Sequence, residues 1–174
     1  RERLLHEPEE VQSNVRLVQA DMRNFELSQA FRLVTIPFRP FQHLTTIEDQ
    51  CACLKCIHRH LVEGGRLILD LFNPSLNMLV ETTVGQEFGE EPEIFMPYGR
   101  RIIRRYKFVS KDLFKQINHI EMIYYVTHPD GHQERLVHTF PMRYLFRFEA
   151  EHLLERCGFQ VEHLYADYDK NPYG

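Results

Sequence analysis

The sequence lacks the features that mark several classes of protein. No apolar run approaches the ~20 residues that a membrane-spanning helix needs. Most of residues 1–10 are charged, which is atypical of a signal peptide, so we expect none. Basic residues are not in excess, since the formal net charge is −4. These absences argue against a membrane protein and against a dedicated nucleic-acid-binding protein.

Cysteine is scarce, with Cys51, Cys53, Cys56 and Cys157 as the full set. Four cysteines, three of them clustered, are too few for a disulfide framework and suit a reducing cytosol, so we expect a cytoplasmic protein. Cys53, Cys56 and His60 come close to one face of an expected helix. A structural zinc site normally uses two separated ligand pairs, and no second pair is present. We therefore expect buried packing of these small residues and no metal ion.

Glycine is also sparse, with 8 residues, and no glycine-rich loop opens the chain. Such a loop normally begins a doubly wound, nucleotide-cofactor domain. The chain has no initiating Met, and a start at RERLLHEPEE is typical of a helix cut in mid-element. What is present is globular in character: 174 residues, 43% apolar and 12% aromatic, are enough for one domain with a real core.

Strand signals appear at three places in the first part of the chain. Residues 15–20 form a short β-branched run, and residues 31–37 and 66–72 are apolar runs. The run at 31–37 has no clean alternation, which is typical of a strand buried on both faces, and we interpret 66–72 in the same way.

A helix is expected at 46–61, between the last two of these strands. Ile47, Leu54, Ile57 and Leu61 fall on one stripe, Thr46 can cap the start with Asp49 three residues on, and Gly64-Gly65 would end it. Strand, helix and strand in this order predict a parallel βαβ unit.

The pattern changes after residue 75. A short helix at 75–79 and an acidic loop at 85–97 precede three β-rich segments, at about 101–110, 113–127 and 133–145. The sequence His128-Pro129-Asp130-Gly131-His132 joins the last two and is a strong hairpin signal. We expect an antiparallel meander inserted in the α/β frame.

The last part returns to the α/β pattern, with a helix at 147–157, Gly158 at its C-terminal cap and a strand at 161–165. The predicted fold class is therefore α/β, an incomplete Rossmann-like doubly wound sheet with an inserted antiparallel β-meander. The expected organisation is a partial core at 1–74, the insert at 75–146 and a return to the core at 147–174.

Four pieces of the chain carry a resemblance to a known family. They are the strand that ends in Asp21-Met22, the sequence Phe41-x-His43-Leu44, the segment His60–Asp70 (HLVEGGRLILD) and the segment Phe148–Asp169. In order and spacing they resemble the class I S-adenosylmethionine-dependent methyltransferases, especially small-molecule N-methyltransferases such as the aminosugar dimethyltransferases and glycine N-methyltransferase. No single piece is specific, but the combination spans nearly the whole chain.

The resemblance implies a cofactor, S-adenosylmethionine, and residues that bind it. Asp21 would accept a hydrogen bond from the adenine amino group, with Met22 against the ring; the alternative is a plain turn or helix-capping Asp. Ile36, Pro37, Phe38 and Phe41 would wrap the methionine and ribose part. An aromatic face near a sulfonium is favourable, but both Phe side chains could instead pack under the helix.

His43 is the candidate catalytic residue, because a histidine there could take a proton from an amine or hydroxyl before methyl transfer. The alternative is a histidine that caps the helix or packs in the core. A catalytic base is not required, because positioning of the two reactants alone can account for most of the rate acceleration of an in-line displacement.

The insert holds further candidates. In the relatives such a sheet covers the active site or forms a subunit interface, so Tyr98 and Tyr144 are expected at the substrate, and a homodimer through the insert is possible. The basic side chains at residues 100–107 would alternate between the two faces of the sheet, because successive residues of a strand point to opposite sides. They therefore predict solvent-exposed residues in preference to a single binding patch.

The resemblance also implies missing parts. The family's strand order is 3-2-1-4-5-7-6, and this chain would hold strands 3, 4, 5 and 6 without the first strand, its Gly-x-Gly-x-Gly loop and the acidic end of the second. The strands at 15–20 and 161–165 would then lose their neighbours. Three explanations stay open: a longer protein, a second chain that supplies the strands, or a different packing around the meander.

The predicted function is methyl transfer from S-adenosylmethionine to nitrogen or oxygen of a small molecule. Two alternatives are kept. A nicotinamide-dependent oxidoreductase would need a Tyr-x-x-x-Lys or similar set after a strand, and none is present. A methyltransferase remnant that serves as an interaction module is favoured by the missing glycine loop.

Overall fold

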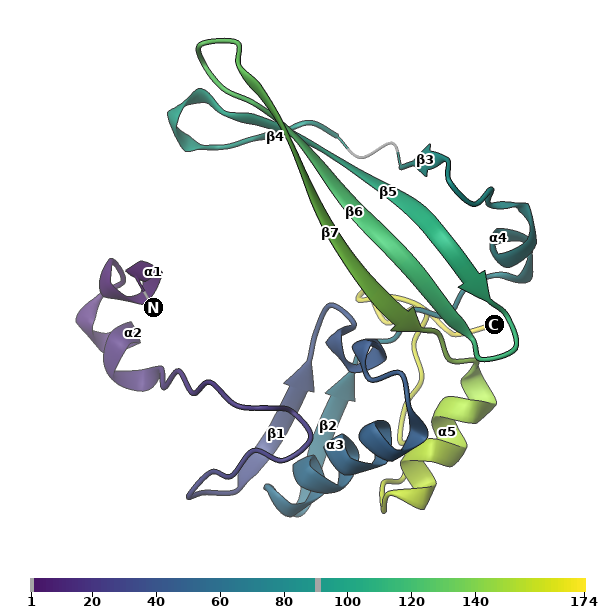
Figure 1. The fold of residues 1–174 in the computed structure, drawn as a ribbon. Coiled ribbons are helices and arrows are strands. Elements are labelled where there is room, and N and C mark those ends of the chain that lie inside the picture. Colours follow the sequence, from purple (N-terminus) through teal and green to yellow (C-terminus); the bar gives the residue numbers. More distant parts are fainter. Residues whose placement is uncertain (1, 90–91) are drawn as a thin grey trace.

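The computed structural model describes residues 2–89 and 92–174 (Figure 1). Two bodies meet in it, an α/β core below and a long antiparallel sheet above. Along the chain the elements are α1 (Glu2–Leu5), α2 (Glu9–Asn14), β1 (Phe31–Ile36), the 3-10 helix η1 (Pro40–His43), α3 (Ile47–Arg59), β2 (Leu61–Leu69), α4 (Leu76–Glu81), β3 (Glu87–Phe88), β4 (Ile94–Phe95), η2 (Pro97–Gly99), β5 (Arg101–Asp112), β6 (Ile117–Thr127), β7 (Gln133–Arg143) and α5 (Arg147–Arg156).

The parallel βαβ unit is confirmed. Strands β1 and β2 pair in parallel, with Val34 opposite Leu67 and Ile36 opposite Leu69. Helix α3 connects them, and its start is capped as the sequence predicts, because Thr46 Oγ1 accepts a hydrogen bond of 3.1 Å from the Asp49 backbone N–H.

One face of this strand pair is not buried, contrary to the sequence-based expectation. The side turned to α3 packs in the core, but Leu33 is 51% exposed and Ile68 58% exposed. Among the described residues no helix covers this second face (Figure 1). The prediction of burial on both faces was wrong because a continuous apolar run shows what a strand can bury and does not show which layers are present.

The core of the α/β part lies between the strand pair, α3 and α5. Phe41, Leu54 and Ile57 are buried at its centre, and Leu153 and Phe159 pack against them from the C-terminal side. Gly158 ends α5 with a φ of +91°, so the predicted cap is confirmed.

Strand β2 begins earlier than the apolar run at 66–72 predicts, and Gly64-Gly65 lies inside it instead of ending the helix. Helix α3 already ends at Arg59. A Cβ atom at position 65 would stand 2.8 Å from the carbonyl oxygen of Val62, so glycine lets the strand curl tightly at this point.

The antiparallel meander is confirmed. Strands β5, β6 and β7 pair in sequence order, and β3 and β4 add short segments along β5. The predicted hairpin closes through a 2.9 Å hydrogen bond from the His128 N–H to the His132 carbonyl, with Gly131 at a φ of +87°. Within its described residues, the predicted acidic loop at 85–97 contains the short strands β3 and β4, which the sequence did not show; residues 90–91 of that loop lie outside the described residues.

Two predicted strands are absent from the described structure. Residues 15–20 and 161–165 lie outside any ladder, although Tyr165 makes an isolated bridge with Pro172. A β-branched run forms a strand only beside a partner, and neither segment has one among the described residues. Helix α2 was not predicted, and Pro8 stands at its N-cap.

No helix in the described part of the chain combines the length and apolar character needed to cross a membrane.

Candidate functional site

The carboxyl ends of β1 and β2 meet at one edge of the sheet, where ligands of open α/β sheets bind. Directly after β1 the chain turns through Phe38 and Arg39, whose φ angles are +62° and +67°. Left-handed backbone costs roughly 1–2 kcal/mol for a residue with a side chain. The turn also leaves the Phe38 side chain 85% exposed at this edge. Backbone strain combined with an exposed aromatic ring marks the turn as a functional candidate.

Asp70, directly after β2, holds this turn in place. Its Oδ2 accepts hydrogen bonds from the Phe38 N–H at 3.0 Å and from the Tyr168 hydroxyl at 2.6 Å. The Arg39 Nε lies 3.9 Å from its Oδ1, and the Arg39 guanidinium stacks over Phe72 at 5.4 Å from the ring centroid. The hydrogen bond to Asp70 raises the pKa of Tyr168, because a carboxylate favours the protonated phenol. One carboxylate thus joins both strand ends and the C-terminal segment.

Asp21 lies beside the N-terminus of α3, on the side of the sheet where β1 ends. Arg23 donates to the Asp21 carboxylate through Nε and Nη2, and its Nη1 donates to Asp49 Oδ1 at 2.9 Å. Hydrogen bonding to Arg23 lowers the pKa of Asp21 from 3.8 to about 2. Asp21 is therefore ionised at neutral pH and exposed, as an acceptor for a ligand's amino group must be.

The loop that carries Asp21 is anchored along α3. Met22 and Phe25 pack against the core, and the Leu27 N–H donates to His60 Nε2 at 3.0 Å. Since His60 Nδ1 lies 2.8 Å from the Cys56 carbonyl oxygen, the proton of the neutral ring is assigned to Nδ1. His60 is thus a structural residue of the helix end.

Helix η1 joins the α/β core to the meander. Gln42 is buried; its Nε2 donates to the carbonyl oxygens of Phe72 and Arg143, and its Oε1 accepts from the Phe72 N–H at 2.6 Å. His43 lies next to it, with its ring 4.9 Å from that of Phe140 and its Nδ1 3.3 Å from the Pro141 carbonyl oxygen. The base of β7 is thereby fixed over the end of β1.

The structure brings several of the predicted site residues together at this edge. Pro37 and Phe38 lie exposed in the turn, and exposed His43 follows within η1. Ile36 and Phe41 belong to the buried core, so Phe41 adopts the packed position that was the alternative to cofactor contact.

The two predicted substrate tyrosines lie far apart. Tyr98 is 91% exposed in η2, next to the β6–β7 hairpin, where Gly99 approaches Pro129. Tyr144 follows β7 at the other end of the meander and is buried, which raises its pKa. Tyr144 follows Arg143, which is bonded to Gln42 of η1, whereas Tyr98 precedes Arg101 at the far end of the same sheet.

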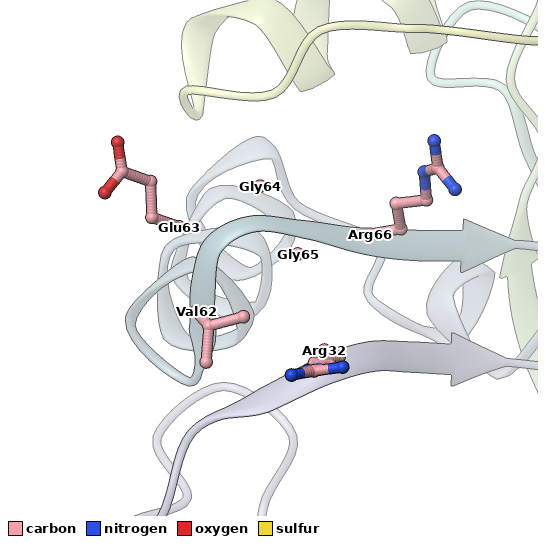
Figure 2. Close-up of a pocket in the computed structure, with 6 residues that line it drawn as sticks. All are labelled: Arg32, Val62, Glu63, Gly64, Gly65 and Arg66. Atoms are coloured by element: carbon pink, nitrogen blue, oxygen red, sulfur yellow. The ribbon is translucent and has the colours of Figure 1, made fainter.

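A hollow of about 540 Å³ lies at the opposite end of the strand pair (Figure 2). Arg32 of β1 and residues 62–66 of β2 line it, at the amino ends of both strands. In Figure 2 the side chains of Glu63 and Arg66 point away from that of Val62. Because ligands of open α/β sheets bind at the carboxyl ends, the edge at Asp70 is the better candidate site.

The four cysteines are buried free thiols, as the packing interpretation predicts. Burial raises the pKa of Cys53 to about 12, and the Cys56 thiol donates to the Phe25 carbonyl oxygen at 3.2 Å. In residues 2–89 and 92–174 no group of three His, Cys, Asp or Glu side chains is placed to hold a metal ion.

Sequence reasoning missed Asp70, Tyr168, Arg23 and Gln42. Asp70 could have been found, because a carboxylate directly after a buried parallel strand faces the ligand edge. Tyr168 and Gln42 carry no such signal in the local sequence. Tyr168 is hydrogen-bonded to Asp70, 98 positions away, and Gln42 to Arg143, 101 positions away.

No protein-family model and no curated protein matches the chain. Solved structures do resemble it. DesVI of Streptomyces venezuelae is 21% identical with a TM-score of 0.69, over 88% of this chain and 61% of that one. The sugar N-methyltransferase KedS8 from Streptoalloteichus is 17% identical with a TM-score of 0.66, over 93% and 61%. CalS10, an amino pentose methyltransferase from Micromonospora echinaspora solved with S-adenosylmethionine bound, is 21% identical with a TM-score of 0.59, over 80% and 54%.

The chain therefore spans about three fifths of the length of the first of these structures. Over that span it has the Rossmann-like fold of the S-adenosylmethionine-dependent methyltransferases, with the meander as part of the matched region.

Proposed function

We propose that the full-length protein transfers a methyl group from S-adenosylmethionine to a nitrogen or oxygen atom of a small molecule. The observation that carries the proposal is the β1 turn, which Asp70 holds at the carboxyl edge of the strand pair and which leads into η1, where Gln42 and His43 contact the base of the meander. The fold of the sugar N-methyltransferases supports it, because those proteins match the chain through both the core and the meander.

The residues at this edge fit the adenosine part of the cofactor. Asp21 offers an ionised carboxylate for the adenine amino group, although Arg23 already uses part of its acceptor capacity. Met22, half-buried beside it, offers an apolar surface for the ring. The exposed ring of Phe38 would attract a sulfonium by about 1–2 kcal/mol once water is excluded. Asp70 and Arg39 keep the backbone of this turn fixed.

Bound S-adenosylmethionine would supply an activated methyl group for in-line displacement by the acceptor, with S-adenosylhomocysteine as the leaving group. This chain's contribution is to orient the acceptor and to receive its proton. A carbonyl oxygen only accepts, so the bond to Pro141 assigns the His43 proton to Nδ1 and leaves Nε2 free to accept one. His43 is exposed at the junction and is the base that we propose for an amine or hydroxyl acceptor.

We propose an amino sugar as the acceptor and a second copy of the chain as a partner. The names of KedS8 and CalS10 support the acceptor class. The partner is supported by β7, whose outer edge pairs with no strand among the described residues and exposes Leu136 and Val137.

The test incubates the full-length protein with S-adenosylmethionine carrying a labelled methyl group and with D-glucosamine or kanosamine. We expect label in the amino sugar. Label in neither sugar, with S-adenosylhomocysteine still bound, would reject this acceptor class. Failure to bind S-adenosylhomocysteine would favour the interaction-module alternative.

A further inference from the structure

Asn118 of β6 is a fully buried amide that has no hydrogen-bond partner among residues 2–89 and 92–174. Its exposure is 0%, and both Nδ2 and Oδ1 are unpaired. The other three buried polar side chains are all bonded, namely those of Gln42, Gln50 and His60. Native structures rarely leave a buried amide unpaired, so Asn118 requires an explanation.

The strand register places Asn118 on the face of the meander that is turned toward η1. It lies opposite Met142 on β7 and opposite Lys111 on β5. Since alternate residues of a strand share a face, Phe140 and Tyr144 flank Met142 on the same side. We call this side the inner face of the meander.

The inner face contacts other elements at both edges of this row. Phe140 meets the ring of His43. On the other edge, Lys111 Nζ donates to the carbonyl oxygens of Leu79 and Thr82, at 2.9 and 2.5 Å, at the end of α4. Asn118 lies between these contacts, opposite Met142 and opposite a lysine that is already bonded. No described residue pairs with its side-chain amide, so a bound ligand can supply the partner.

We propose that Asn118 is a specificity-determining residue for the methyl acceptor and pairs with a hydroxyl or amino group of an amino sugar. This inference rests on the proposed function. An amide offers two donors and two acceptor lone pairs, which complement a polyhydroxylated ligand. Met142 lies opposite, and its unbranched, flexible side chain is the one that must move aside for the ligand.

If Asn118 serves to bind the methyl acceptor, its replacement should affect stability differently from the replacement of an asparagine that is hydrogen-bonded within the fold. An amide that is unpaired in the empty protein destabilises it, so an apolar side chain of similar size should raise Tm. The same change removes the polar anchor, and a site built around a buried polar group discriminates strongly against its loss.

The test compares Asn118→Leu and Asn118→Val with the wild-type full-length protein, with Asn77→Leu as the control because Asn77 is an exposed amide on α4. The measurements are Tm, calorimetric affinity for S-adenosylhomocysteine, and kcat/KM for D-glucosamine and kanosamine. We expect both Asn118 variants to melt above wild type and to bind S-adenosylhomocysteine within about twofold of it, while kcat/KM falls roughly tenfold or more. The control should match wild type.

Two results would overturn the role of Asn118: a lower Tm in both variants, which would mean that the amide is bonded in the empty protein, or an unchanged kcat/KM. A wild-type protein that binds S-adenosylhomocysteine but methylates neither sugar overturns the assigned ligand. If it binds no S-adenosylhomocysteine, the proposed function itself fails, and this inference with it.

Discussion

Gln42 and Arg143, 101 positions apart, are joined by a 3.0 Å hydrogen bond from the Gln42 amide to the Arg143 carbonyl oxygen. The same amide is bonded to both the N–H and the carbonyl oxygen of Phe72. One buried side chain therefore connects η1, the exit of β2 and the base of β7. The position of the meander over the candidate site depends on this junction.

Replacement of Gln42 by Leu should destabilise the protein by about 2–4 kcal/mol, because it leaves buried backbone groups of Phe72 and Arg143 unpaired. Urea unfolding of the full-length protein measures the change. Gln160→Leu is the matched control, since Gln160 is exposed, and it should change stability by less than about 0.5 kcal/mol. Equal stabilities of the two variants would contradict the junction.

Local signals predicted a good part of this fold. The Thr46 cap, the Gly158 cap and the hairpin at His128–His132 each depend on residues close in sequence, and all three are present. The strand at β1 and its parallel partner followed from apolar runs on either side of a helix.

Features that depend on distant partners could not be predicted. Residues 15–20 carry the same β-branched signal as a strand but have no neighbour to pair with in the described structure. At the site, Asp21 was predicted but its partner Arg23 was not, and Tyr168 reaches Asp70 from 98 positions away. Tyr98 and Tyr144 looked equivalent in sequence, and only the path of the meander separates them.

Phe38, in the turn after β1, should lower the stability of the protein and at the same time contribute to cofactor binding. Phe38→Gly relieves a left-handed backbone and should stabilise the protein by about 1 kcal/mol. Loss of the ring should weaken S-adenosylhomocysteine binding and, more strongly, S-adenosylmethionine binding, because only the latter carries the sulfonium charge. Phe38→Ala is the control: it removes the ring but keeps the strain, so it should weaken binding without stabilising. A destabilised Phe38→Gly protein would contradict the strain.

The hydrogen bond between Tyr168 and Asp70 should be visible in a phenol titration. Donation to the Asp70 carboxylate raises the pKa of Tyr168, so ultraviolet difference spectra should show this tyrosine ionising above its ordinary pH range. Asp70→Asn removes the charged acceptor and should bring the pKa of Tyr168 back toward its ordinary value. An unchanged titration in that variant would show that the contact is not formed in solution.

Asp21 should titrate well below an ordinary aspartate. Arg23 lowers the pKa of its carboxyl from 3.8 to about 2, so the ionised form favours the folded state. The resulting stabilisation is complete above pH 3.8 and is lost as the pH falls toward about 2. Carbon NMR of the side-chain carboxyls follows this titration directly. In Arg23→Met the midpoint should rise toward 3.8, and a midpoint that stays low would assign the shift to another cause.

We propose that S-adenosylmethionine binds with its adenine at Asp21 and its sulfonium at the β1 turn. The most direct measurement is calorimetric titration of the full-length protein with S-adenosylhomocysteine, with Asp21→Ala and, as an exposed control, Asp169→Ala. We expect saturable binding by the wild type, about tenfold weaker binding by Asp21→Ala from the loss of a charge-assisted hydrogen bond, and unchanged binding by Asp169→Ala. Equal affinity of Asp21→Ala and wild type would contradict the placement of the adenine, and no binding by the wild type would contradict the function.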